Sequence, residues 1–314
     1  MRIVFAGTPC FAAAHLRALV QNGFSVVGVL TQPDRPAGRG QYLQESSVKK
    51  VALDYAIPLQ QPRQLKTLDD WQCIISWQPD ILIVVAYGLL IPEEVLNIPN
   101  LGAFNVHASL LPRWRGAAPI QRSIEAGDTE TGVGLMRMEP GLDTGPVLLE
   151  THCPIAPKET AEELESTLCS LGQQLLIRGL NQLRGVGVVI PWEIRPQSTT
   201  GVTYAHKVSG KDTWVNWDLP AQQLERQIRA FHGLRTYFQG VVLKIYQADV
   251  VLQPDQIEGS PGQVSAIYSD FWDVQTGAGI LRLHQVQLAG GKILSSRDFL
   301  QGRIIPVGLF LGIC

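Results

Sequence analysis

The feature that most constrains the fold of this 314-residue chain is an almost uninterrupted apolar run at residues 80–87, Asp-Ile-Leu-Ile-Val-Val-Ala-Tyr. A strand with one solvated face alternates polar and apolar residues, whereas a strand covered on both faces does not. The start of the chain agrees with a covered sheet. Residues 2–6 and 25–31 form two apolar runs, and the residues after Gly7 have the spacing of an amphipathic helix. We therefore predict an α/β fold with a mostly parallel, doubly wound sheet, with further strands at 102–107 and 132–138.

The second half of the chain has a different pattern. Thr160 and Glu163 form a capping box, which predicts a long helix running to about residue 183. After a connector rich in Gly and Pro, a helix is predicted at 222–231, followed by short alternating runs with Gly turns. These runs lie at 241–251, 262–267, 271–275 and 279–288. Short strands at close spacing favour a small C-terminal β-barrel, which we expect to be OB-like. We place the catalytic domain at 1–188, a linker at 189–206 and the barrel domain at 207–314.

Composition excludes several classes of protein. The net charge of −2 argues against attachment to nucleic acid by bulk charge alone. Five cysteines without a CxxC pair make a disulfide framework or a cysteine-rich zinc site unexpected, and no spacing typical of metal ligands occurs. No apolar run approaches the roughly 20 residues that span a bilayer, and the N-terminus lacks the pattern of a signal peptide. We therefore expect a soluble, cytoplasmic protein without a metal, a membrane contact or an obligate protein partner.

Three polar residues lie where chemistry is expected. Asn105 and His107 are two residues apart at the end of a predicted strand, so both side chains point to one face. Asp143 follows in a Gly-rich turn, where a plain turn aspartate is an equally good interpretation. Together they offer an oxyanion donor, an acid or base, and a carboxylate that can orient it. Because the chain has no GxSxG and no cysteine placed against the histidine, the pattern favours acyl transfer directly onto an external nucleophile.

The sequence resembles the methionyl-tRNA formyltransferase family over essentially its whole length. The matching motifs are Phe5-Ala-Gly-Thr-Pro9, residues 31–40, Val85-Ala-Tyr-Gly88, the long segment from Asn105 to Gln121, Gly141-Leu-Asp-Thr-Gly145 and residues 224–231. The long segment is highly specific, whereas the short Gly-Thr-Pro and Gly-Leu-Asp-Thr-Gly pieces occur in other formyl-folate enzymes too.

The resemblance implies a Rossmann-like formyltransferase domain joined to a barrel that helps to bind tRNA. It implies 10-formyltetrahydrofolate as formyl donor and the amino group of methionine on initiator tRNA as acceptor, in translation initiation. The family's catalytic residues fall on Asn105, His107 and Asp143. Its folate-binding residues fall on Ser109, Leu110, Leu111 and Pro112. Its acceptor-stem loop falls on residues 32 to about 49, with Arg39 as the basic tRNA-binding residue.

The chain departs from the family pattern at residues 41–47 and 232–237, and residues 207–314 carry ten Lys or Arg against nine Asp or Glu. A net charge of +1 is a weak basis for tRNA affinity. Three alternatives stay open: another formyl-folate enzyme (a formyltetrahydrofolate hydrolase or an amino-sugar formyltransferase), a nicotinamide-dependent oxidoreductase, and a non-enzymatic tRNA-binding protein. The oxidoreductase lacks support because the turn after the first strand is not GxGxxG.

Overall fold

The computed structural model describes residues 1–37, 42–184, 195–251 and 259–312. The chain divides into two compact units. The first contains residues 1–119, 130–154 and 165–206, and the second contains residues 120–129, 155–164 and 207–314. Within the described residues, no helix combines the length and the apolar character needed to cross a bilayer.

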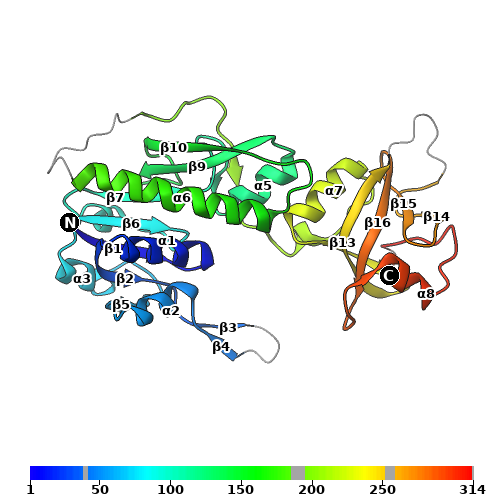
Figure 1. The fold of residues 1–314 in the computed structure, drawn as a ribbon, viewed down its shortest axis with the longest axis horizontal. Coiled ribbons are helices and arrows are strands. Elements are labelled where there is room, and N and C mark those ends of the chain that lie inside the picture. The colour runs from blue at the N-terminus through cyan, green and yellow to red at the C-terminus, as the bar shows by residue number, and fades with distance from the viewer. Residues whose placement is uncertain (38–41, 185–194, 252–258, 313–314) are drawn as a thin grey trace. The chain divides into compact units, whose positions relative to one another are not determined.

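The first unit is built on a seven-stranded sheet in the order β10-β9-β7-β6-β1-β2-β5 (Figure 1). The five strands from β7 to β5 are parallel, whereas β9 and β10 add antiparallel pairs at one edge. The strands are β1 (Arg2–Gly7), β2 (Ser25–Leu30), β5 (Leu59–Gln60), β6 (Ile81–Val85), β7 (Ala103–His107), β9 (Glu130–Arg137) and β10 (Val147–Pro154). All five residues of β6 are buried, so the prediction of a mostly parallel sheet from this apolar run is confirmed.

Helices cover both faces of this sheet. They are α1 (Cys10–Gln21), α2 (Ser47–Asp54), α3 (Leu68–Trp77), α4 (Glu93–Leu96) and α6 (Ala161–Arg184), most of which belongs to this unit. On one face, Trp71 and Ile74 of α3 pack in a core cluster with Val4 and Leu82. On the other face, α6 approaches α1 so closely at Gly172 that a Cβ there would lie 2.6 Å from Nε2 of His15. The capping box expected at Thr160 is present, because the Glu163 amide donates to Thr160 Oγ1 (3.3 Å).

The second unit contains an antiparallel sheet in the order β12-β13-β16-β15-β14, with β17 paired to β16. Its strands are β12 (Leu234–Phe238), β13 (Val241–Val251), β14 (Val264–Ile267), β15 (Trp272–Gln275), β16 (Ile280–Leu288) and β17 (Leu294–Ser295). Its helices are α5 (Pro119–Ala126, of which 120–126 belong here), η1 (Lys211–Thr213), α7 (Ala221–Ala230) and α8 (Ser296–Gln301). Three buried aromatic side chains of this unit, Phe238, Trp272 and Phe299, are in mutual ring contact.

The expected barrel is not found in this part of the chain. Across the residues that the structure describes, the strands form an antiparallel sheet in which no ladder joins β12 to β14, its two ends, so a closed OB-like barrel is not shown. The pattern of short strands was interpreted correctly, but closure depends on pairing between the first and last strands. That pairing is a long-range property which alternation along each strand does not encode.

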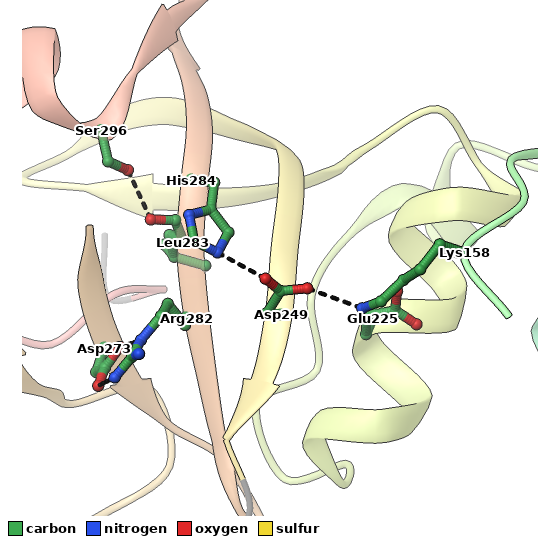
Figure 2. Close-up of polar contacts among 8 residues, drawn as sticks. All are labelled: Lys158, Glu225, Asp249, Asp273, Arg282, Leu283, His284 and Ser296. Atoms are coloured by element: carbon green, nitrogen blue, oxygen red, sulfur yellow. Dashed lines mark hydrogen bonds and ion pairs between the residues drawn. The ribbon is translucent and has the colours of Figure 1, made fainter. Parts of the chain in front are cut away.

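Within the second unit, polar contacts connect the segment 155–164 to α7 and to the antiparallel sheet (Figure 2). Lys158 Nζ lies 2.8 Å from Asp249 Oδ1 on β13 and 3.3 Å from Glu225 Oε1 on α7. Asp249 Oδ2 in turn lies 2.9 Å from Nε2 of His284 on β16. The hydrogen bond from Lys158 holds the pKa of Asp249 below its ordinary value. A single exposed lysine therefore links a helix, a strand and the segment that precedes α6.

Candidate active site

Asn105 and His107 lie at the carboxyl end of β7, near the point where the sheet changes from parallel to antiparallel pairing. Both side chains are buried, with 9 % and 5 % of the residue exposed. Their spacing of two along a strand places them on the same face, as predicted. Open α/β sheets bind ligands at the carboxyl ends of their strands, so this position suits a reactive site.

Asp143 reaches this strand end from the loop between β9 and β10. Its Oδ1 accepts a hydrogen bond from Asn105 Nδ2 (3.3 Å), and its Oδ2 accepts one from the backbone N–H of Gly116 (2.8 Å). The same Oδ2 lies 3.7 Å from His107 Nδ1. The structure therefore brings together the three residues that the sequence singled out, although they are up to 38 positions apart.

The other nitrogen of His107 fixes the orientation of the ring. Nε2 lies 2.9 Å from the backbone carbonyl oxygen of Trp114. A carbonyl oxygen only accepts, so Nε2 carries the proton and donates it. Nδ1 consequently faces Asp143, and at 3.7 Å it is beyond hydrogen-bond distance. Nδ1 therefore faces the space between His107, Asn105 and Asp143, as an acceptor in the neutral ring and as a donor only in the imidazolium.

The expected folate-binding residues follow directly after β7. Ser109 is buried, and its Oγ donates to the backbone carbonyl of Arg113 (2.6 Å), which closes a turn around Leu110, Leu111 and Pro112. These three residues are half-buried. The turn thus offers apolar surface beside the catalytic strand end. Arg39, the expected tRNA-binding residue, lies outside the described residues.

The structure also brings in a segment that sequence reasoning missed. Residues 195–206 return to the site, where β11 (Tyr204–Ala205) pairs with β8 (Arg115–Gly116) and Thr203 Oγ1 accepts from the Trp114 amide (2.9 Å). Gln197 contacts both the Asp143 loop and Arg115. These residues lie more than 50 positions from the motifs they contact, in a stretch that reads as a connector, so no local pattern marked them.

A pocket of about 550 Å³ lies beside the Asp143 loop. Its walls come from three places: Arg115, the loop residues Glu139, Thr144 and Pro146, and the returning segment 196–204. The lining combines hydroxyl, carboxylate and guanidinium groups with the apolar surface of Pro146, Pro196, Val202 and Tyr204. Among the described residues, no three His, Cys, Asp or Glu side chains are grouped so that they could hold a metal ion.

Comparison with known proteins identifies the family to which this fold belongs. Residues 1–180 match the formyl transferase family model, and residues 207–303 match the model of the formyl transferase C-terminal domain. The solved structure of an N-formyltransferase from Helicobacter canadensis, in complex with folinic acid and dTDP-3-aminofucose, has a TM-score of 0.65 at 18 % identity. That match covers 91 % of this chain and 99 % of the other. The matches to the two family models therefore identify the chain as a formyl transferase.

Two relatives of high sequence identity show which formyl transferases this chain resembles in sequence and length. The methionyl-tRNA formyltransferase of Idiomarina loihiensis is 47 % identical over 308 residues, and that of Marinobacter nauticus is 46 % identical over 305 residues. Each alignment covers 96 % of this chain and 96 % of the relative. The chain belongs to the methionyl-tRNA formyltransferase family.

Proposed function

We propose that this protein transfers the formyl group of 10-formyltetrahydrofolate to the amino group of methionyl-tRNA, giving formylmethionyl-tRNA for translation initiation. The observation that carries the proposal is the convergence of Asn105, His107 and Asp143 at one strand end, in a chain whose relatives at 46–47 % identity are methionyl-tRNA formyltransferases. The sugar N-formyltransferase at 18 % identity shares only the fold, so it gives no comparable support for a sugar substrate.

The reaction moves one carbon from nitrogen to nitrogen. The neutral amine of methionine attacks the formyl carbon, a new C–N bond forms, and negative charge develops on the formyl oxygen. The bond from the formyl carbon to the folate nitrogen then breaks. The proton lost by the amine ends on that nitrogen, so atoms and charge balance without a covalent enzyme intermediate.

Asn105 and His107 supply the donors for the developing oxyanion. One N–H of the Asn105 amide points to Asp143, which leaves the second for the formyl oxygen. His107 Nδ1 faces the same space, because Nε2 donates to the Trp114 carbonyl; in the imidazolium form Nδ1 carries the second proton and can donate it to the formyl oxygen. Donors fixed in advance at the site of charge development need no reorganisation during the reaction, which makes them effective.

Asp143 orients both donors. Its two oxygens contact Asn105, face His107 and accept from Gly116, so one carboxylate sets the positions of the amide and of the ring. Burial of Asn105 and His107 keeps bulk water away from these contacts and strengthens them.

The donor and acceptor bind on different parts of the chain. We assign the folate to the turn formed by Ser109, Leu110, Leu111 and Pro112, whose half-buried apolar side chains suit an aromatic pteridine. We assign initiator tRNA to Arg39 and to residues 207–314. Within that second region, Arg235 lies directly opposite Lys244 across β12 and β13. Burial, and then repulsion from Arg235, lower the pKa of Lys244, so a phosphate placed there would relieve an unfavourable pairing.

A formylation assay with purified components tests the proposal. Wild-type protein is given 10-formyltetrahydrofolate together with charged initiator methionyl-tRNA, charged elongator methionyl-tRNA, an amino sugar nucleotide, or no acceptor. We expect rapid formylation of the initiator tRNA, slower formylation of the elongator tRNA, and little turnover with the sugar or with folate alone. Hydrolysis of the folate without acceptor at the same rate would instead identify a hydrolase, and preferential use of the sugar would identify an amino-sugar formyltransferase.

A further inference from the structure

We propose that Gln197 is a positioning residue for formyl transfer, because its side-chain amide holds the Asp143 loop in the geometry that the reaction requires. The inference rests on the proposed function, in which Asp143 orients Asn105 and His107. Gln197 lies within the predicted linker, residues 189–206, and its side chain contacts the Asp143 loop and Arg115.

The amide of Gln197 makes every hydrogen bond that its geometry permits. Nε2 donates to the backbone carbonyls of Asp143 (2.8 Å) and Gly145 (2.7 Å). Oε1 accepts from Nε (3.0 Å) and from a terminal nitrogen (2.7 Å) of Arg115. Two donors and two acceptor positions are the full capacity of a glutamine amide. A half-buried side chain with all four positions used is specifically placed.

The Asp143 loop needs such support. Asp143 has a φ of 51°, in the left-handed region that residues other than glycine adopt at an energetic cost. Residues keep such a conformation only when their surroundings hold them in it. The two carbonyls that Gln197 binds flank Thr144, so one amide fixes both ends of the turn. A Cβ at Gly145 would collide with the carbonyl of Arg137, which shows how closely this turn also packs on β9.

The same amide joins the two chain segments that set the position of the Asp143 carboxylate. Arg115 immediately precedes Gly116, whose N–H donates to Asp143 Oδ2. Gln197 therefore binds the Asp143 turn through its nitrogen and the Arg115–Gly116 strand through its oxygen. Without the Gln197 side chain, the Asp143 carboxylate would no longer be held in position against the Gly116 N–H and His107.

Two variants of Gln197 and one control test the donor contacts separately from the acceptor contacts. Gln197→Ala removes both, while Gln197→Glu keeps the size and the contacts with Arg115 but places an oxygen against the two carbonyls. We expect both to lower kcat by between about 10- and 100-fold with the KM for each substrate changed by less than about threefold, since a small misplacement of a catalytic group acts on the chemical step. Thr200→Ala, at an exposed position of the same segment, is the matched control and should match wild type.

A double-mutant cycle tests whether Gln197 acts through Asp143. Adding Gln197→Ala to Asp143→Asn should reduce kcat by less than about threefold further, because the group that Gln197 positions is already impaired. Full activity of Gln197→Glu, or an undiminished effect of Gln197→Ala in the Asp143→Asn background, would overturn the proposal. The isosteric glutamate variant serves for both measurements if the alanine variant does not fold. Failure of wild-type protein to formylate methionyl-tRNA would contradict the proposed function instead, so the two failures are distinguishable.

Discussion

At the scale of single residues, the carboxylate of Asp143 is shared among three groups of the site. It accepts from Asn105 Nδ2 and from the Gly116 N–H, and it faces His107 Nδ1. An asparagine in its place has only one acceptor atom, so at least one of these groups would face an N–H instead. Asp143→Asn should therefore lower kcat by about 100-fold or more, a loss typical of general acid–base groups.

The unfolding free energy of Asp143→Asn is the control for this comparison. It should stay close to the wild-type value, because the substitution is isosteric and the loop is half-buried. Normal turnover of Asp143→Asn would show that Asp143 acts only as a turn residue.

A second residue-scale prediction concerns His15, which lies fully buried between α1 and α6 and uses Nδ1 to contact the Phe11 carbonyl (2.7 Å). Burial lowers the pKa of His15 from 6.5 to about 4. The unfolded chain therefore binds a proton between these values that the folded chain excludes. The contribution of neutral, buried His15 to the free energy of unfolding is fully present above pH 6.5. It is lost as the pH falls toward 4, by up to about 3 kcal/mol.

Urea unfolding at several pH values between 7.5 and 4.5 measures this effect. The stability difference between wild type and His15→Gln should shrink or reverse in favour of the variant as the pH falls. His152→Gln, at a position more than half exposed, provides the comparison and should show much less change. A difference that is independent of pH for His15→Gln would show that burial does not control its protonation.

At the scale of elements, two aspartates of the second unit, Asp273 and Asp249, both pair with basic side chains but differ greatly in exposure. Asp273 on β15 is 4 % exposed and makes two 2.8 Å contacts with Arg282, whereas Asp249 is 52 % exposed. Removing one partner of a buried pair leaves an uncompensated charge, but exposed pairs contribute little. Asp273→Asn should lower the unfolding free energy by roughly 2 kcal/mol or more, and Asp249→Asn by less than about 1 kcal/mol. Chemical unfolding of the two variants, followed side by side, checks the order, and equal effects would contradict it.

Local patterns predicted the elements well where the pattern itself has a physical cause. The apolar run at 80–87 predicted β6, and alternation at 241–251 predicted β13 with the same bounds. The antiparallel strand β10 was missed, because its sequence, Val-Leu-Leu-Glu-Thr-His-Cys-Pro, does not alternate apolar and polar residues. The patterns could not predict whether the C-terminal sheet closes into a barrel, because strand closure is decided between residues far apart in sequence.

The site was predictable to a similar degree. Asn105 and His107 share a strand, so their spacing alone placed them together, and the Gly-rich turn around Asp143 marked a position that could approach them. Gln197 and Thr203 could not be found in this way. Their contacts are to backbone atoms of distant loops, and a backbone carbonyl leaves no mark on the sequence that surrounds it.

At the scale of the whole molecule, tRNA recognition and chemistry are expected to be separable. The loop that carries Arg39 begins from a fixed base, where Lys49 and Gln61 both bind the Asp34 carboxylate (2.6 and 2.8 Å). An arginine gives a charge-assisted phosphate contact that alanine cannot. Arg39→Ala should therefore raise the KM for methionyl-tRNA several-fold and leave the KM for the folate donor unchanged. The difference from wild type should shrink as salt increases, because salt weakens the contact in the wild-type protein too.

Steady-state kinetics with each substrate varied in turn, at low and moderate salt, give this measurement. Lys66→Ala, at an exposed cation outside the loop, is a suitable control. If Arg39→Ala instead raises the folate requirement and leaves use of tRNA intact, the loop belongs to the donor site.

The most direct test of the catalytic assignment is single-turnover formylation of charged initiator methionyl-tRNA by Asn105→Ala, with both substrates bound before the reaction starts. The variant loses one oxyanion donor and keeps the backbone of β7. The rate of formyl transfer should therefore fall roughly 100- to 1000-fold while the dissociation constant of the folate stays within about threefold of wild type. A near-wild-type rate would contradict the account, because the strand end at Asn105 and His107 would then not be where formyl transfer takes place.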